Sequence, residues 1–271
     1  MRKLILAILL ILCMCVYASA GTTVVVVQGV AAGAATCTGA APTGCTGRET
    51  FDGSTDCGDD PNNAQTCDNT WTLLSHSYPD YTGNADCTDT EVPYVCCTGS
   101  EAGTCPAAVE GTYSMNVQDN WTNNPTIGIS ATDEIVVASM FRTSGTNTNY
   151  VIQLRDTSSN DLCRAENGGG SFLKANNTGG STGGDGLTLN VDTDYYVRVR
   201  AKKGTGANAQ CEVWVSTDGT NWGTSSSSTN GTWTAQVEKI GLSPGNNNAE
   251  NIMDDIRWLS GSSMDGTEVS Y

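Results

Sequence analysis

The chain has few basic residues and a single histidine. Lys and Arg number 13 against 29 Asp and Glu, which gives a formal net charge of −16 over 271 residues. This balance argues against a nucleic-acid partner, because phosphate binding needs clustered Lys and Arg. The one histidine, His76, leaves no Ser/His/Asp arrangement for nucleophilic catalysis, and no C-x-x-C pair is present to form a zinc site with it.

Long hydrophobic runs are absent after the first residues. Arg2 and Lys3 precede an apolar run over 4–16, and the small residues 18–20 follow it. These are the three parts of a secretory signal peptide, so we expect residues 1–20 to be removed on export. No later run approaches the roughly 20 apolar residues that a membrane helix needs, so we expect no membrane span. The sequence therefore predicts a secreted protein, in solution or at the cell surface.

Cleavage after residue 20 would remove two of the 13 basic residues and two of the 12 cysteines. A net charge of −18 and ten cysteines would remain. The two lost cysteines, Cys13 and Cys15, raise the alternative of a lipoprotein signal. Leu12 and Met14 precede them, however, at positions where such signals carry a small residue.

The ten remaining cysteines follow a pattern of short loops. An even number in an exported chain favours disulfides over free thiols. The same nine-residue frame occurs twice, as CTGAAPTGC at 37–45 and CTGSEAGTC at 97–105. Zinc ligation and a strained vicinal pair at 96–97 are the alternatives. The pairs that we expect are Cys37 with Cys45, Cys97 with Cys105, Cys57 with Cys67, Cys87 with Cys96, and Cys163 with Cys211, the last joining distant strands.

The pattern of apolar residues predicts an all-β protein. Short β-like runs alternate with clusters of Gly, Asn, Asp and Ser, and no run has a helical period. We expect a lead-in with a Cys loop at 21–48, a β-sandwich domain at 49–259 with a Cys-rich insertion at about 57–105, and a loose polar tail at 260–271. The expected strands are 49–52, 70–74, 111–117, 134–141, 150–155, 162–166, 195–202, 211–216, 237–242 and 252–259.

One stretch, CEVWVSTDGTNWG at 211–223, has two interpretations. Ser216, Asp218, Gly219 and Trp222 resemble the Asp-box of sialidase-like β-propellers. A propeller would repeat the motif in each blade, whereas it occurs once here and lacks the residue that normally separates its Asp and Gly. Asp-Gly is a strong signal for a tight turn, because Gly tolerates positive φ. We therefore favour a β-hairpin.

Three stretches resemble the concanavalin A-like, laminin G-like jelly-roll superfamily of secreted lectin-like domains. RETFDG at 48–53 is similar to its first strand, residues 194–222 to its paired central strands, and NIMDDIRWLSG at 251–261 to its closing strand. The resemblance implies an antiparallel β-sandwich of the jelly-roll type. It also implies a structural calcium between the first and last strands, which Glu49, Asp52, Asp254 and Asp255 would hold. The alternative is that Asp255 faces solvent and Asp254 only ends the strand ladder.

The alternation in the central strands suggests a binding surface. If 195–202 and 211–216 pair, one face is apolar and the other carries aromatic and charged side chains. Aromatic rings stack on sugar rings, and Arg and Glu beside them can bond hydroxyls. We expect a glycan or polysaccharide as partner; the alternative is that Trp214 packs under a neighbouring loop. The residues of this candidate surface are Tyr196, Arg198, Arg200, Glu212 and Trp214.

Catalytic signals are missing from the sequence. Jelly-roll glucanases carry E-x-D-x-x-E or a close variant on one strand, and no such run is present. We therefore expect a non-catalytic carbohydrate-binding module. The alternatives are a structural or adhesive surface protein that binds another surface protein, such as an adhesin or a virion fibre component, and an unrecognised polysaccharide-cleaving enzyme.

Overall fold

The computed structural model describes part of the chain. The described part does not include the expected signal peptide at 1–20, nor Asp52, Cys57, Cys87 and Cys105. The chain divides into two compact units, Met1–Ala34 and Ala35–Tyr271, and every described residue belongs to the second. The described residues are 37, 44–50, 55–56, 66–67, 71–73, 94–97, 113–117, 125–143, 150–167, 173–177, 183, 188–229, 233–242 and 251–271.

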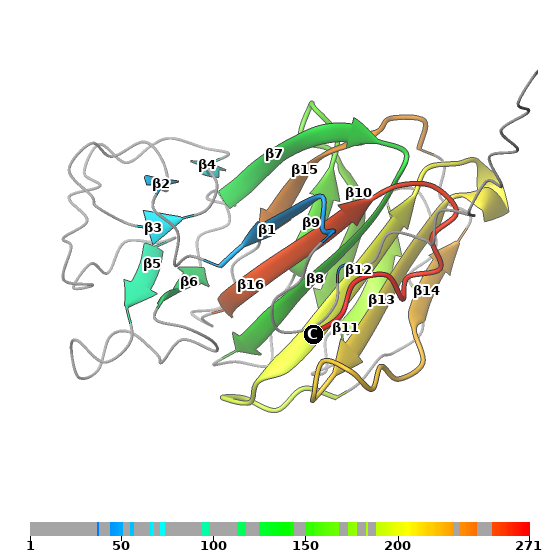
Figure 1. Cartoon of the computed structure of the whole chain (residues 1–271). Helices are drawn as coiled ribbons and strands as arrows, with labels where there is room; N and C mark the ends of the chain where they lie inside the picture. Colours follow the sequence, from blue (N-terminus) through cyan, green and yellow to red (C-terminus); the bar gives the residue numbers. More distant parts are fainter. Residues whose placement is uncertain are drawn as a thin grey trace, which may run out of the picture. The chain divides into compact units, whose positions relative to one another are not determined.

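Two antiparallel sheets form a sandwich (Figure 1). The larger has eight strands, ordered β14-β13-β12-β8-β16-β6-β5, and β1 pairs with β16 off this path. Its strands are β1 (Gly47–Glu49), β5 (Tyr94–Cys97), β6 (Tyr113–Val117), β8 (Glu134–Thr143), β12 (Tyr195–Lys202), β13 (Gln210–Ser216), β14 (Ser226–Thr229) and β16 (Asn251–Ser260).

The smaller sheet has six strands, ordered β11-β10-β9-β15-β7-β4. They are β4 (Trp71–Leu73), β7 (Pro125–Thr132), β9 (Tyr150–Arg155), β10 (Asp161–Asn167), β11 (Leu173–Asn177) and β15 (Val237–Leu242). Strands β2 (Thr55–Asp56) and β3 (Thr66–Cys67) pair separately, and Gly206–Asn208 forms a 3-10 turn, η1. Among the described residues, no helix has the length and hydropathy needed to cross a membrane.

The core lies between the sheets and follows the predicted alternation. On β12 and β13 the inward side chains are almost fully buried, and they pack with apolar residues of β8, β9, β10, β15 and β16. Burial of this apolar area is the main favourable term in folding. The inward residues of β12 and β13 are Tyr195, Val197, Val199, Ala201, Cys211, Val213 and Val215.

Two disulfides occur among the described residues, and both pairings were predicted. Cys163 on β10 bonds to Cys211 on β13 and so joins the two sheets across the core. Cys37 bonds to Cys45, eight residues further along the chain. Such bonds occur in oxidising compartments, which is compatible with an extracellular protein. The other predicted pairs, among Cys57, Cys67, Cys87, Cys96, Cys97 and Cys105, lie outside the described side chains.

All ten predicted strands occur, three with the predicted ends and seven with shifted ends, and the predicted antiparallel β-sandwich is confirmed. Three of the strands that sequence patterns missed carry breaker or low-propensity residues. β7 begins with Pro125 and contains Gly128, β14 reads SSST, and β11 reads LKANN. Each is a strand because it pairs with a stronger neighbour, β7 with β15, β14 with β13 and β11 with β10. Tertiary pairing therefore overrides local propensity here.

Candidate functional site

The predicted pairing of the central strands is present. In the β12–β13 ladder, Arg198 lies opposite Trp214 and Arg200 lies opposite Glu212. Because side chains alternate along a strand, these four residues share the outer face of the larger sheet, opposite the core. Tyr196, opposite Ser216, continues the same row. The five predicted residues therefore lie on one face, at the end of the sheet formed by β12, β13 and β14.

Arg198 is the centre of an aromatic cluster. Its guanidinium carbon lies 4.7 Å from the centre of the Trp214 ring and 4.2 Å from that of Trp222. Tyr196 extends the cluster, since its ring centre is 4.8 Å from that of Tyr271. All four aromatic side chains are half-buried. We use "aromatic cluster" for Trp214 and Trp222 on Arg198 together with the pair formed by Tyr196 and Tyr271.

The cation in this cluster is removed from water. Arg198 is 2% exposed, and burial lowers its pKa to about 10, an effect that the carboxylates of Glu268 and Asp265 oppose. A stacked guanidinium gains most when it is desolvated, because water then screens the ring quadrupole least. Two N–H donors of the cluster, Arg198 Nε and Trp222 Nε1, are buried and have no hydrogen-bond partner in the described part of the chain.

The turn after β13 brings Trp222 back to this face. Ser216 Oγ accepts hydrogen bonds from the N–H groups of Asp218 and Gly219, at 3.2 and 3.0 Å. Asp218 Oδ1 accepts from the N–H groups of Thr220 and Asn221 at 2.9 and 2.7 Å. Hydrogen bonds from the Asn221 side chain and from these N–H groups lower the pKa of Asp218. Gly219 has φ +73°, as the Asp-Gly turn requires.

The predicted tight turn is therefore confirmed, within the connection that leads from β13 to its antiparallel partner β14. The resemblance to an Asp-box reflects this local hydrogen bonding. Trp222 was not among the predicted site residues. The signal that could have found it was the turn itself, because a chain that reverses after Ser216 returns its next aromatic residue to the strand that it has just left.

Residues 261–271, which we call the C-terminal segment, cover much of this face (Figure 1). They were expected to be a loose tail. Instead Met264 and Val269 are buried with Val136 and Ala138 of β8, and Arg198 Nη1 donates to the carbonyl oxygen of Val269 at 3.2 Å. Apolar outer residues on β8 give the segment an apolar surface to bury.

The face is consequently less accessible than the alternation alone suggested. Arg198 and Arg200 are 2% and 6% exposed, whereas Tyr196, Glu212 and Trp214 remain half-buried. Gly266 packs so closely on the indole of Trp214 that an added Cβ would lie 2.4 Å from it. The alternative for Trp214, packing under a neighbouring segment, therefore holds where Gly266 meets its six-membered ring.

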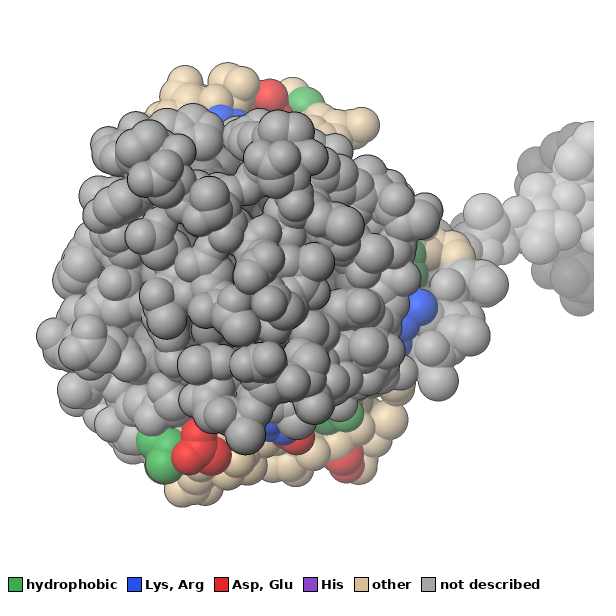
Figure 2. All heavy atoms as spheres, turned by 90° about the vertical axis from the view of Figure 1, so that its left-hand side faces the viewer, with side chains coloured by type: hydrophobic (Ala, Val, Ile, Leu, Met, Phe, Trp, Pro, Cys, Tyr) green, Lys and Arg blue, Asp and Glu red, His purple; other side chains and the backbone are tan. Residues whose placement is uncertain are grey.

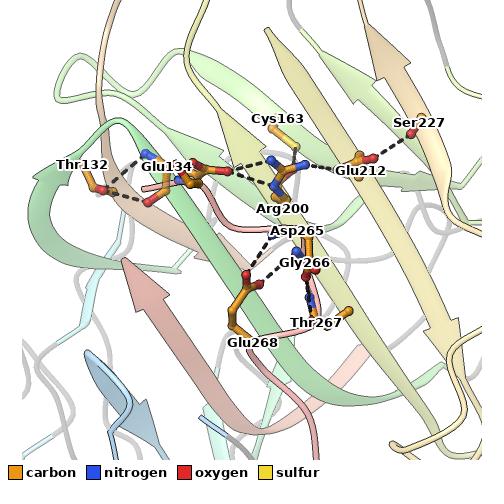
Figure 3. A network of polar contacts seen from close by, with 11 residues as sticks. Thr132, Glu134, Cys163, Arg200, Glu212, Ser227, Asp265, Gly266, Thr267 and Glu268 are labelled. Atoms are coloured by element: carbon orange, nitrogen blue, oxygen red, sulfur yellow. Dashed lines mark hydrogen bonds and ion pairs between the residues drawn. The ribbon is translucent and has the colours of Figure 1, made fainter. Parts of the chain in front are cut away.

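Arg200 joins two carboxylates of the same face (Figure 3). Its Nη2 donates to Glu134 Oε1 at 2.7 Å, its Nη1 donates to Glu212 Oε2, and Ser227 Oγ donates to Glu212 Oε1 at 3.1 Å. Burial would lower the pKa of Arg200, but these two carboxylates outweigh it and raise the pKa. Ser263 N–H donates to the second oxygen of Glu134 at 2.8 Å, so this carboxylate also holds the C-terminal segment.

Of the predicted calcium ligands, Asp255 is bound by two arginines. Arg48 donates to both oxygens of Asp255, at 2.6 and 2.9 Å, and Arg257 Nε donates to Oδ2 at 3.1 Å. Burial would raise the pKa of Asp255, but the two arginines outweigh it and lower the pKa. Glu49 is buried, and Asp254 Oδ1 accepts the N–H of Asp255 at 2.7 Å. The described residues contain no group of three or more His, Cys, Asp or Glu able to hold a metal.

Charged side chains elsewhere on the described surface are mixed in sign. Figure 2 shows acidic, basic, apolar and neutral polar side chains interspersed at the rim of that view. Arg142 pairs with Asp194 at 2.6 Å, and Lys203 pairs with Asp133 at 3.0 Å. Such exposed pairs contribute little to stability. In the part of the chain that the structure describes, the aromatic cluster is therefore the distinctive surface feature.

Comparisons with known proteins give only remote similarity. No protein-family model matches the chain, and no curated protein matches its sequence. Among solved structures, a sialidase has a TM-score of 0.41 and 13% identity over 57% of this chain, which spans 16% of the sialidase. Cellulose induced protein Cip1 has a TM-score of 0.46 and 13% identity, with 70% of this chain and 91% of that one covered. For endo-beta-1,4-glucuronan lyase from the fungus Trichoderma reesei the values are 0.41 and 12%, with 59% and 85% covered.

Proposed function

We propose that this protein is a secreted, non-catalytic carbohydrate-binding module, and that it belongs to the concanavalin A-like, laminin G-like jelly-roll superfamily. The observation that carries the proposal is the aromatic cluster, in which two half-buried indoles lie on Arg198 and a pair of half-buried tyrosine rings lies on the same face. Exposed ring faces stack on the C–H faces of sugars, and neighbouring polar groups bond their hydroxyls. Trp222 and Tyr196 are the contacts that we expect to matter most, because the C-terminal segment packs closely on Trp214.

Binding without catalysis is supported by the ion pairs that the carboxylates on this face form. Glu134 and Glu212 both lie on this face, and Arg200 forms ion pairs with both. A general acid must be able to reach its substrate, whereas Arg200 holds both of these carboxylates in ion pairs. We therefore assign these acids to the structure of the sheet face.

A structural or adhesive surface protein is the second candidate. It is favoured by the closure of the sheet face by the protein's own C-terminal segment. A protein of this kind needs a stable surface whose polar groups are hydrogen-bonded within the protein itself. It would recognise another protein. The two functions differ in whether any polysaccharide binds saturably.

The test is a pull-down of the oxidised full chain on a panel of soluble and insoluble polysaccharides, with calcium and with chelator, in which the supernatant is assayed for released sugars. We expect retention without sugar release, and loss of retention in Trp222→Ala. Tyr150→Ala is a matched control, because Tyr150 is also half-buried and stacked by an arginine, Arg164, at 4.3 Å, but it lies on the smaller sheet. Absence of retention on every polysaccharide would overturn the proposal in favour of the second candidate, and released sugar would overturn its non-catalytic part.

A further inference from the structure

The C-terminal segment is bound much as an extended peptide ligand would be. Arg198 Nη1 donates to the Val269 carbonyl at 3.2 Å, and Arg257 Nη1 donates to the Ser270 carbonyl at 2.8 Å. The Tyr271 N–H donates to the Gly219 carbonyl at 3.2 Å. Main-chain groups of the segment are thus recognised by arginine side chains and by the backbone of the 216–222 turn. Recognition of this kind is typical of peptides that bind along a sheet.

The charges of the segment complement those of the face. Its acidic residues, Asp265 and Glu268, attract Arg198, and Asp265 also interacts with Arg200. The segment contains no basic residue. Glu268 in turn accepts the N–H groups of Asp265 and Gly266, at 2.8 and 2.9 Å, which fixes the turn shown beside Arg200 in Figure 3. The face therefore suits an acidic chain segment.

Cys37 holds this segment in place from its other edge. The Cys37 N–H donates to the Glu268 carbonyl at 2.6 Å, and the Ser270 N–H donates to the Cys37 carbonyl at 3.1 Å. These two bonds form an isolated parallel bridge between Cys37 and Val269. The bridge is a single isolated one. Its position is held by the burial of Cys37 in the cluster that contains Val136 and Ala138, and by the disulfide.

The disulfide connects this bridge to the body of the sheet. Cys45 is followed by Thr46, whose N–H donates to the Trp258 carbonyl at 2.9 Å, and by β1, which pairs with β16. Cys45 is half-buried, whereas its partner Cys37 and both cysteines of the other described disulfide, Cys163 and Cys211, are fully buried. A reductant therefore reaches the Cys37–Cys45 bond first, because thiol–disulfide exchange depends on access to the sulfur.

We propose that the Cys37–Cys45 disulfide is a redox latch that keeps the C-terminal segment on the outer face of the larger sheet, and that its reduction uncovers a surface recognising an acidic chain segment. A dithiol supplies two electrons and two protons, the Sγ–Sγ bond becomes two thiols, and the dithiol becomes a cyclic disulfide. Cys37 then remains joined to Cys45 only through the intervening peptide chain, and the segment leaves the face more often. This inference does not depend on carbohydrate binding.

The first test compares hydrogen exchange of residues 261–271 in the oxidised full chain and in Cys37→Ser/Cys45→Ser. We expect exchange in the segment to be faster by about tenfold or more in the double variant, since closing a short loop restricts the open chain substantially, while amides of β12 are unchanged. Ser270→Ala is the matched control, because it keeps the main-chain groups that bond at this position, and it should exchange as the wild type does. Equal protection of the segment in the double variant would overturn the proposal.

The second test uses wild-type protein and applies if the double variant fails to fold. Wild-type protein is titrated with a dithiol, and its thiols are labelled and mapped. We expect Cys37 and Cys45 to be labelled before Cys163 and Cys211, with faster exchange of residues 261–271 at the same dithiol concentration. A labelled peptide with the sequence GSSMDGTEVSY should then bind the reduced protein and not the oxidised one. The opposite labelling order, or no peptide binding after the segment is released, would contradict the latch or the recognition surface respectively.

Discussion

The guanidinium carbon of Arg198 lies 4.2 Å from the centre of the Trp222 ring. Arg198→Lys removes the planar group that stacks between two indoles and bonds to Val269, while it keeps the charge. Because a desolvated arginine–aromatic contact contributes on the order of 2 kcal/mol, we expect the free energy of unfolding to fall by about 1–2 kcal/mol. Urea denaturation followed by tryptophan fluorescence measures it.

The control for this substitution is Arg142→Lys. Arg142 pairs with the exposed carboxylate of Asp194, so the change should alter stability by less than about 0.5 kcal/mol. Equal effects of the two substitutions would show that the stacked environment of Arg198 contributes nothing beyond an ordinary surface charge.

Gly266→Ala should displace the C-terminal segment from Trp214. Gly266 has φ +95°, and an added Cβ would lie 2.4 Å from the indole, so backbone strain and a steric clash act together. We expect a loss of about 2 kcal/mol or more and a change in tryptophan emission. Gly223→Ala is the matched control, because nothing lies within 4 Å of its added Cβ. An unchanged emission spectrum in Gly266→Ala would contradict the close packing.

Asp255→Asn should destabilise the protein at neutral pH and remove part of its acid sensitivity. The folded-state pKa of Asp255 is lowered, so its contribution is fully present above the ordinary carboxyl pKa of about 3.9 and is lost as the pH falls through the folded-state value. Two arginines would lose a buried partner, at a cost on the order of 3 kcal/mol at neutral pH. Urea denaturation across the acid range should show the wild type and the variant converging below about pH 4. A constant difference would contradict the pKa shift.

Tyr271→Phe tests how the stability of the protein changes at alkaline pH. Burial raises the pKa of the Tyr271 hydroxyl, and the carboxylate of Asp255 adds to this, so the stabilising effect is present below the ordinary pKa of about 10 and is lost as the pH rises through the folded-state value. The hydroxyl also donates to the Asp255 carbonyl. We expect the wild type to exceed the variant by about 1 kcal/mol near neutral pH and to lose that advantage above about pH 10. A difference in the free energy of unfolding that does not depend on pH would contradict the raised pKa of Tyr271.

Much of the sandwich could be predicted because its central strands have a regular period. Tyr195 to Lys202 alternates cleanly, and the expected pairing of Arg198 with Trp214 on one face follows from that alternation. The disulfide between Cys37 and Cys45 was predictable from a repeated spacing. In both cases the information lies in residues close together in the sequence.

The covering of the candidate site could not be predicted in this way. Residues 261–271 look like a loose tail, because Gly, Ser and Asp dominate them and only Met264 and Val269 signal burial. Their position depends on the outer residues of β8, more than 100 residues earlier, and on Cys37. The ion pair of Asp255 with Arg48 was missed for the same reason, because the two residues are 207 positions apart in the sequence.

A titration of the oxidised full chain with soluble oligosaccharides of the retained polysaccharide, followed by tryptophan emission, tests carbohydrate binding by the aromatic cluster most directly. We predict a saturable change in emission that is lost in Trp222→Ala and Tyr196→Ala and kept in Tyr150→Ala. A saturable change that persists in both cluster variants would contradict the assignment of the site, and no saturable change with any oligosaccharide would contradict carbohydrate binding itself.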